Sequence, residues 1–319
     1  MTKKINIKTL NCLNFGDAIN KLFWEILTNG TIYYNGNELH YLTTGSIMCL
    51  VDEKSIIFGT GFISQHGDIG GGDFKSTSNR KIKKPHSVIA VRGPLSRQKL
   101  LDFEIDCPEN YGDPLLLMPC INYNCLEINK NIIGIIPHYI DKNNNNYKLL
   151  KKNLEKDKYV VKFIDIEVGS NHKKLIDDIN SCKYIISSSL HGVMMGIVYK
   201  KRTIFIEFGD KVVGNGFKFQ DFFKSININY KNINTYDTKI LDNVINVDYK
   251  YLVSTGVKLI SLIPFIETER KTELIDKYKK FYNTKTCISE VVYYAPVSTI
   301  SNVNVNVNVR GRRKLKNNL

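Results

Sequence analysis

Residues 184–192 read YIISSSLHG, and they indicate the fold of the chain around them. Four residues typical of a buried strand run into a polar turn, and a helix opens near Leu190. Such a junction directs backbone N–H groups, serine hydroxyls and the positive end of a helix toward one point. The stretch therefore predicts a parallel α/β unit whose turn binds an anion such as phosphate or a carboxylate.

On both sides of this stretch, short apolar runs alternate with segments of helical spacing, which is typical of parallel sheets covered by helices. Further strands are predicted at residues 5–7, 55–58, 87–91, around Asn110, and at 131–136, 159–163 and 202–206. Helices are predicted at residues 17–27, 94–101, 143–154 and 171–180. Residues 251–282 should be mostly helical and brace the first half, with a kink or break at Pro264.

The length of 319 residues exceeds the size of one hydrophobic core, so two domains are expected. We place an N-terminal Rossmann-like lobe at residues 1–125 and a second at 131–285, with a linker at 120–130. From residue 295 the chain alternates Val and Asn and ends RGRRKLKNNL. We expect residues 295–319 to be a disordered basic tail that the chemistry does not need, although such alternation also suits an edge strand.

The composition is that of an ordinary globular protein, with 43% hydrophobic and 24% charged residues. The N-terminus lacks the apolar region of a signal peptide, and no run approaches the roughly 20 apolar residues of a membrane helix. The seven cysteines are scattered without a CxxC pair or the spacing of a metal site. A cytoplasmic protein with reduced cysteines and no metal is therefore expected.

The formal net charge is +14, of which five charges come from the tail, leaving about +9 for the body (14 − 5). A basic body suits a small anionic substrate as well as a polyanion. The basic residues are dispersed, and no aromatic-basic recognition motif is present, which argues against nucleic acid.

Ligands of open α/β sheets bind beyond the carboxyl ends of the strands, so the loops there are the candidate sites. In the 187–192 turn, we expect Ser187, Ser188, Ser189 and Gly192 to bind an anion and His191 to donate a hydrogen bond or a proton. The alternative is an ordinary helix cap with a packed histidine.

Two further strand ends carry groups suited to anions. His138 follows the 131–136 strand, with Asp141 just beyond, and the alternative is a satisfied surface histidine. Arg92 ends the 87–91 strand and precedes Gly93 and Pro94, an arrangement that suits bidentate capture of a carboxylate or phosphate. The alternative for Arg92 is an inter-domain salt bridge.

Acidic and glycine-rich loops complete the set. Asp17 follows Asn14 and Gly16 in a loop that opens a helix, where it could take a proton from a sugar hydroxyl or cap the helix. Asp113 could likewise take a proton or cap a helix. The segment GTGFIS at 59–64, which contains Gly61, lacks the third glycine of a dinucleotide fingerprint, and we infer no dinucleotide from it.

Several segments together resemble the polysaccharide pyruvyl transferase family over residues 11–225. In order they are NFGDAIN, GTGF, AVRGPLSRQKLL, YGDPLLLMP, IGIIPHYID, IISSSLHGVMMGIVYKKRTIFIEF and FKFQDFF, with RGP and SSLHG the most specific. The resemblance implies an arrangement similar to GT-B glycosyltransferases, with the acceptor side in the first lobe, the donor side in the second and the active site in the cleft between them. The family's SLHG histidine matches His191 and its RGP arginine matches Arg92.

The resemblance also implies transfer of the enolpyruvyl unit of phosphoenolpyruvate to two hydroxyls of a sugar, giving a pyruvate ketal and phosphate. That reaction needs a general acid, for which His191 or His138 is suited, and a base, for which we consider Asp17 or Asp113. No cofactor or metal is required. On the donor side, charged groups would be held by Arg92, Arg202 or Lys218, and the acceptor side would use Asn14, Gly16, Asp17 and Gly61.

Three other functions were weighed. A GT-B glycosyltransferase using a nucleotide-sugar would need a ribose-binding acid, for which Glu207 is the candidate. A non-catalytic nucleic-acid binder is motivated by net charge alone. A Ser–His hydrolase lacks the GxSxG motif. An oligomeric state is compatible with each of these functions.

Overall fold

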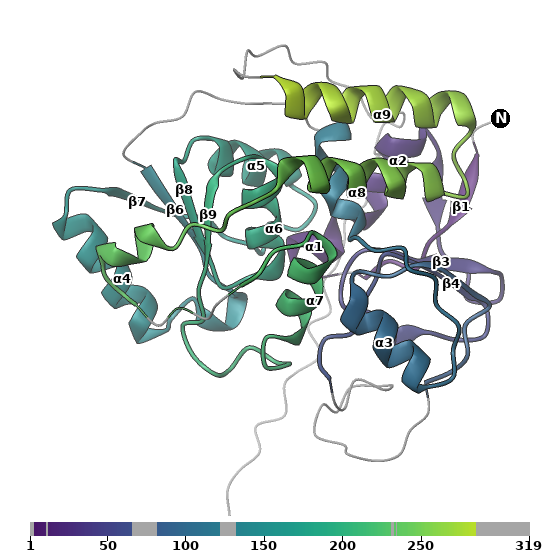
Figure 1. Ribbon diagram of the computed structural model, residues 1–319, viewed down its shortest axis with the longest axis horizontal. Coiled ribbons are helices and arrows are strands. Elements are labelled where there is room, and N and C mark those ends of the chain that lie inside the picture. The colour runs from purple at the N-terminus through teal and green to yellow at the C-terminus, as the bar shows by residue number, and fades with distance from the viewer. Residues whose placement is uncertain are drawn as a thin grey trace, which may run out of the picture.

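The computed structural model describes residues 3–10, 12–65, 82–121, 132–230, 233 and 235–284 (Figure 1). These residues form an α/β fold with parallel sheets and helices, as predicted. The tail at 295–319 and most of the 120–130 segment lie outside these residues, so what was expected of them stays a prediction. Among the described helices, none is long and apolar enough to cross a membrane.

The first half of the chain builds two small parallel sheets that one bridge connects. β1 (Lys4–Asn6) pairs with β2 (Thr31–Tyr33), and β3 (His40–Leu42) pairs with β4 (Ser55–Phe58), which pairs with β5 (Ser87–Ala90). A parallel bridge between Ile7 and Tyr41 places β1 beside β3, so the spatial order is β2-β1-β3-β4-β5. The strand predicted around Asn110 is reduced to one bridge, between Val91 and Tyr111.

The second half builds a four-stranded parallel sheet in the order β7-β6-β8-β9, from the predicted strands. They are β6 (Ile132–Ile136), β7 (Val160–Phe163), β8 (Tyr184–Ser187) and β9 (Arg202–Phe205). Neighbouring residues of β8 serve opposite faces, because Ile186 packs with α4 (Asn145–Lys156) while Ile185 packs with α5 (His172–Asn180) and α6 (Leu190–Val198). Every residue of α6 is buried, which explains its apolar sequence.

The helix predicted at 17–27 begins earlier and is interrupted at Ile19, giving α1 (Phe15–Ala18) and α2 (Asn20–Thr28). Asn14 caps α1 by accepting a hydrogen bond from the Gly16 N–H, so Asp17 is not the cap. α3 (Pro94–Asp102) begins at its proline, as predicted. Short 3-10 turns lie at η1 (Met48–Leu50), η2 (Pro114–Cys120), η3 (Tyr139–Asp141) and η4 (Thr238–Asp242).

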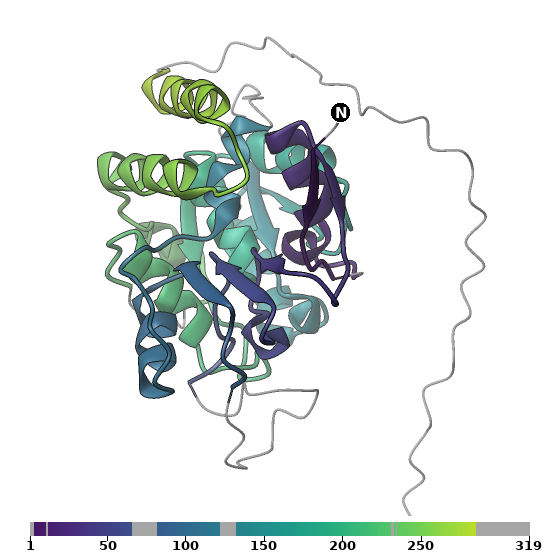
Figure 2. The same ribbon diagram turned by 90° about the vertical axis from the view of Figure 1, so that its right-hand side faces the viewer.

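The C-terminal helices bind to both halves of the chain, which confirms the predicted brace. The chain breaks at Pro264 between α8 (Tyr249–Leu262) and α9 (Thr268–Asn283), which lie side by side at one edge (Figures 1 and 2). Phe265 lies edge-on to Trp24, with ring centroids 5.2 Å apart, and the Tyr282 hydroxyl donates to the carbonyl of Val198, 3.1 Å away. The largest buried cluster runs through residues of both halves, and the division into lobes at 1–125 and 131–285 stays a prediction.

Candidate active site

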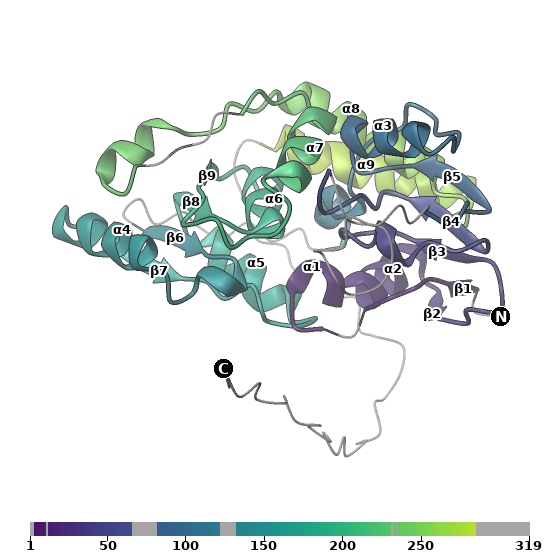
Figure 3. The same cartoon turned by 90° about the horizontal axis from the view of Figure 1, so that it is seen from below.

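The candidate site lies where the strand order of each sheet reverses. β1 lies between β2 and β3, and β6 lies between β7 and β8, so the chain leaves these strands toward opposite sides. Ligands of open α/β sheets bind beyond the carboxyl ends of the strands at such points. The loops at these two points carry α1 and α6. Figure 3 shows α1, α6 and α7 (Phe217–Ser225) between the two groups of strands. The two halves therefore contribute to one region.

His191 in the first turn of α6 contacts the cap of α1. Its Nδ1 lies 3.3 Å from Oδ1 of Asn14, which also accepts the N–H of Gly16, so Nδ1 carries the proton and Nε2 the lone pair. Nε2 is buried and has no partner among the described residues. A Cβ on Gly16 would lie 1.9 Å from the imidazole, so glycine is needed there for the ring to pack.

His138 lies at the end of β6 and is also buried. Its backbone N–H donates to Oγ of Ser188 at 2.8 Å, and the Ser188 hydroxyl donates to Oδ2 of Asp141 at 2.7 Å. The His138 ring accepts the N–H of Ile140 at Nδ1, 3.4 Å away. These bonds connect the turns after β6 and β8.

Burial, together with the positive charge of Lys218, lowers the pKa of both imidazoles to about 3. The unliganded site therefore holds neutral histidines at physiological pH. An anion bound beside them would reverse this effect, because negative charge favours the imidazolium form.

The other residues of the 187–192 turn divide into two groups. Ser187 donates to the carbonyl of Ile136 at 2.7 Å and accepts the N–H of Ser189 at 3.0 Å, so it holds the turn together. A Cβ on Gly192 would lie 2.4 Å from that hydroxyl, so Gly192 serves the same packing. Ser189 is buried at the N-cap of α6 without a capping bond from its side chain. Ser188 and Ser189 therefore lie at the N-terminal end of α6.

Lys218 on α7 is the principal cation of the region. Only 8% of its surface is exposed, and its ammonium has no hydrogen bond or ion pair with any residue that the structure describes. Burial, together with the charge of Arg92, lowers its pKa to about 8, while Asp17 and Asp141 oppose that shift. The described contact of this ammonium is with the face of the Phe219 ring, 5.5 Å from its centroid. A buried ammonium without an ion pair is costly, and an anionic ligand would relieve that cost.

Two carboxyl groups from the first half approach this cation. Burial raises the pKa of Asp17 to about 6, against the opposing charge of Lys218. Burial also raises the pKa of Asp113 to about 6. Asp113 is fully buried and caps η2 by accepting the N–H of Leu115 at 3.0 Å, whereas Asp17 is partly exposed. Asp17 is thus the more exposed of the two residues.

Arg92 is buried in an ion pair and does not face a free pocket. Its Nε lies 3.0 Å from Oδ2 of Asp221 on α7, its Nη1 donates to Ser46 at 2.6 Å, and its Nη2 donates to the carbonyl of Phe62. The salt bridge that was the alternative for Arg92 is therefore present. A Cβ on Gly61 would lie 2.7 Å from the guanidinium, so the structure places Gly61 against Arg92, within this packing.

The structure does not bring Arg202 to the site. Arg202 is the first residue of β9 and pairs in register with Tyr184, the first residue of β8, whereas the candidate turn follows Ser187 at the other end. Its exposed guanidinium lies 4.8 Å from the centroid of the Tyr184 ring. The expectation of donor binding by Arg202 was therefore wrong, because its side chain lies at the amino end of the sheet.

Sequence reasoning missed two acids that organise the site. Asp221 lies within the FKFQDFF segment but was given no role, although a single acid among aromatic residues is itself a signal of a buried partner. Asp141 was noted only as a neighbour of His138. Its Oδ1 is buried without a described partner, and burial raises its pKa while the Ser188 hydroxyl opposes that shift.

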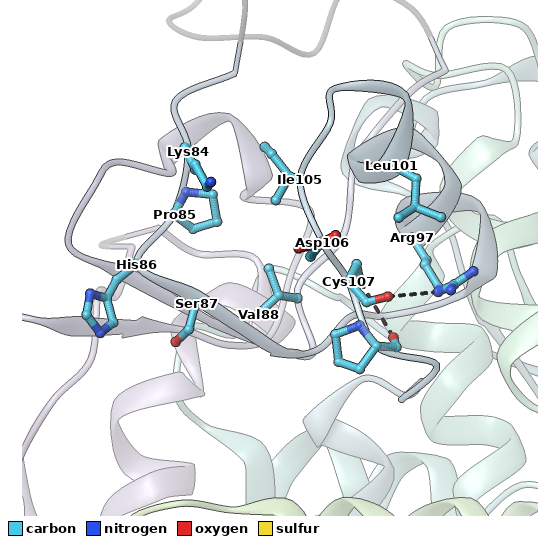
Figure 4. A pocket seen from close by; sticks show the side chains of 11 residues that line it. Lys84, Pro85, His86, Ser87, Val88, Arg97, Leu101, Ile105, Asp106 and Cys107 are labelled. Carbon is cyan, nitrogen blue, oxygen red and sulfur yellow. Dashed lines mark hydrogen bonds between the residues drawn. The ribbon is translucent and has the colours of Figure 1, made fainter.

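A cavity of about 670 Å³ lies elsewhere, at the amino end of β5 (Figure 4). Its lining includes Lys84, His86, Arg97 and Cys107, and Arg97 donates to the carbonyl of Cys107 at 2.9 Å. It contains none of the expected site residues. Within the described ranges, no group of three or more His, Cys, Asp or Glu side chains could hold a metal ion.

Comparison with known proteins identifies the family. Residues 14–210 match the sequence model of the family described as Polysaccharide pyruvyl transferase. The match covers more than half of the chain, so this protein belongs to the polysaccharide pyruvyl transferase family, whose members transfer pyruvyl groups to glycans. The chain is also 27% identical to Uncharacterized protein L143 of Acanthamoeba polyphaga mimivirus over 282 residues, which cover 83% of this chain and 87% of that protein.

The matched range begins at the cap of α1 and ends beyond β9. It includes Asn14, Arg92, His138 and His191, and it stops before Lys218. The resemblance of the sequence to this family is therefore confirmed, while α7, which carries the FKFQDFF segment of that resemblance, lies beyond the matched range.

Proposed function

We propose that this protein transfers the enolpyruvyl unit of phosphoenolpyruvate to two hydroxyls of a sugar in a glycan or glycan precursor, forming a pyruvate ketal and releasing phosphate. The observation that carries the proposal is the buried Lys218 ammonium, which has no hydrogen bond or ion pair among the described residues, lies 5.5 Å from the centroid of the Phe219 ring, and lowers the pKa of both His138 and His191 by its charge.

The surroundings of Lys218 favour a small and highly charged anion. The N-terminus of α6 presents the Ser189 hydroxyl and the free N–H groups of its first turn, which suit phosphate or carboxylate oxygens. Phosphoenolpyruvate carries both groups on three carbons. Arg92 is engaged in its ion pair with Asp221, so it does not contact the donor, and its positive charge acts on this region from a distance.

The chemistry requires a proton at the methylene carbon of the donor. His191 is our candidate acid, because its Nε2 is buried without a described hydrogen-bond partner and the residue lies in the first turn of α6, whose N–H groups suit the donor. The resting imidazole is neutral, and the negative charge of the bound donor raises its pKa so that it becomes protonated. His138 is the alternative acid.

The remaining steps balance the reaction. Protonation turns the methylene into a methyl group, and the first sugar hydroxyl adds to the neighbouring carbon while losing its proton to a base. The carbon–oxygen bond to phosphate then breaks, and the second hydroxyl adds to the same carbon while its proton passes to the departing phosphate, which leaves as hydrogen phosphate. Asp17 suits the base, because it is partly exposed and its pKa of about 6 is close to physiological pH.

The test is binding followed by turnover. Calorimetry should show phosphoenolpyruvate binding without added metal. Phosphate release should then require an acceptor from a panel of β-galactosides, N-acetylhexosamines and their lipid- or nucleotide-linked forms. Binding of a nucleotide-sugar in place of phosphoenolpyruvate would replace this proposal with the glycosyltransferase function.

A further inference from the structure

We infer that Tyr139, in the turn that follows β6, is a stacking platform for a pyranose ring of the acceptor glycan. The inference rests on the proposed function, because that reaction needs a binding site for the acceptor, and the groups described above serve mainly the donor.

Tyr139 combines exposure with direct contact to the site. It is 47% exposed, although it directly follows His138, which is only 7% exposed. The two ring centroids lie 4.4 Å apart with planes inclined at 33°, so the tyrosine covers the histidine with part of its surface and keeps the rest for solvent. Exposed apolar side chains are common on protein surfaces, so it is the contact with a histidine of the site that distinguishes Tyr139.

Two other exposed apolar side chains lie on loops that leave carboxyl ends of strands. Leu13, after β1, is 64% exposed and precedes Asn14, whose side chain contacts His191. Val213, after β9, is 36% exposed and lies in the loop that leads to Lys218 on α7. Each of the three loops thus joins an exposed apolar residue to a polar residue of the site.

This combination fits a sugar better than a small anion. Phosphoenolpyruvate needs cations and N–H groups, and it gains little from an exposed ring. A pyranose presents polarised C–H groups on one face, which pack against the electron-rich face of an aromatic ring, and hydroxyls at its edges. Tyr139 would hold the C–H face, while the partly exposed Asp17 receives a proton from a hydroxyl at the edge.

The experiment compares Tyr139→Ala with Tyr139→Phe, using the panel glycan that gives the fastest phosphate release. Loss of stacking should raise the acceptor KM of Tyr139→Ala about tenfold, with kcat changed much less, because the ring binds substrate and transition state alike. Tyr139→Phe keeps the ring and should stay within about twofold to threefold of the wild type. Tyr251→Ala removes a tyrosine that is 40% exposed on α8 and should change nothing.

Two further measurements separate this inference from the proposed function. The affinity of Tyr139→Ala for phosphoenolpyruvate alone should equal that of the wild type. Saturation-transfer NMR with the same glycan should show contact at its ring C–H protons in the wild type and lose it in Tyr139→Ala. An unchanged acceptor KM in Tyr139→Ala would overturn the inference and leave the donor chemistry standing, whereas failure of the wild type to bind phosphoenolpyruvate would overturn the proposed function.

Discussion

The guanidinium Nε of Arg92 lies 3.0 Å from Oδ2 of Asp221, and both side chains are completely buried. The pair joins the end of β5 to α7, the helix that also carries Lys218. Asp221 further accepts the N–H and the hydroxyl of Ser96, at 2.9 and 2.6 Å. Arg92 therefore acts on the site by fixing the helix that presents Lys218.

Replacement of Arg92 should accordingly reduce stability first. Arg92→Met leaves the Asp221 carboxylate buried without its cation, which should lower the free energy of unfolding by about 3–5 kcal/mol. Urea denaturation measures this change. Lys3→Met removes an exposed pair with Glu267 and should cost less than about 1 kcal/mol. A variant of Arg92 with normal stability and a much higher KM for phosphoenolpyruvate would show instead that the arginine holds the donor.

Gly16 should be needed to keep the His191 ring in place. In Gly16→Ala the new Cβ would lie 1.9 Å from the His191 ring, so the ring must leave its contact with Asn14. We expect turnover per folded molecule to fall about 10²-fold, because a displacement of about 1 Å has that effect on catalytic groups. The free energy of unfolding should fall by about 1–3 kcal/mol, because the substitution overpacks a buried contact.

Gly36→Ala is the matched control for this substitution. The nearest atom to its new Cβ would be the flexible Tyr34 hydroxyl, at 3.1 Å. Phosphate release by this variant should equal that of the wild type. Equal turnover in Gly16→Ala would mean that the position of the His191 ring does not matter for the reaction.

His191→Asn tests the proton donor. Asparagine cannot supply a proton at neutral pH, so turnover should fall about 10²–10⁴-fold while the melting temperature hardly moves, because Nε2 has no hydrogen bond to lose within the described residues. His86→Asn, at the amino end of β5, is the control and should be fully active.

Proton uptake gives a second readout for the same residue. In the wild type, binding of phosphoenolpyruvate raises the pKa of His191 from about 3, so a proton should enter with the donor. Calorimetry in two buffers of different ionisation enthalpy measures that proton, and His191→Asn should take up less. A variant that melts several degrees lower and keeps near-normal turnover per folded molecule would make His191 structural and His138 the next residue to test.

Local patterns predicted the strands that are long and continuously apolar. β4 and β8 were predicted with their observed boundaries, because each has three apolar or aromatic residues in a row next to a serine, between polar segments. β2 and β3 were missed, since each has only three residues and depends on its neighbours in the sheet. The start of α1 was misplaced because Asn14 competes with Asp17 as a cap, and both residue types suit that position.

The candidate site was predictable where the logic of strand ends was sufficient. His138 and His191 follow β6 and β8 and lie together as expected, because parallel strands bring their carboxyl ends to one edge. The prediction for Arg202 was wrong by the same logic, because Arg202 is the first residue of β9 and not a residue that follows its carboxyl end. The pairing of Arg92 with Asp221 spans 129 residues of sequence, and no local pattern carries such a contact.

Lys218→Met is the sharpest test of the site, because stability and function should change in opposite directions. Burial lowers the pKa of Lys218 to about 8 in the folded protein from an ordinary value of 10.5. The unfolded chain thus binds the proton more tightly, so the ammonium costs on the order of 2–3 kcal/mol at pH 7, and the wild type gains stability as the pH rises from 8 toward 10.5. Methionine has a similar length and no charge, so the variant should be more stable at pH 7 and should lack that gain.

The affinity of Lys218→Met for phosphoenolpyruvate should fall at least about 100-fold, which corresponds to the loss of one buried ion pair with the donor. Lys224→Met, on an exposed position of the same helix, should change neither quantity. Urea denaturation across this pH range and calorimetry with phosphoenolpyruvate measure both effects, and a stabilised variant that still binds phosphoenolpyruvate with wild-type affinity would remove Lys218 from the donor site.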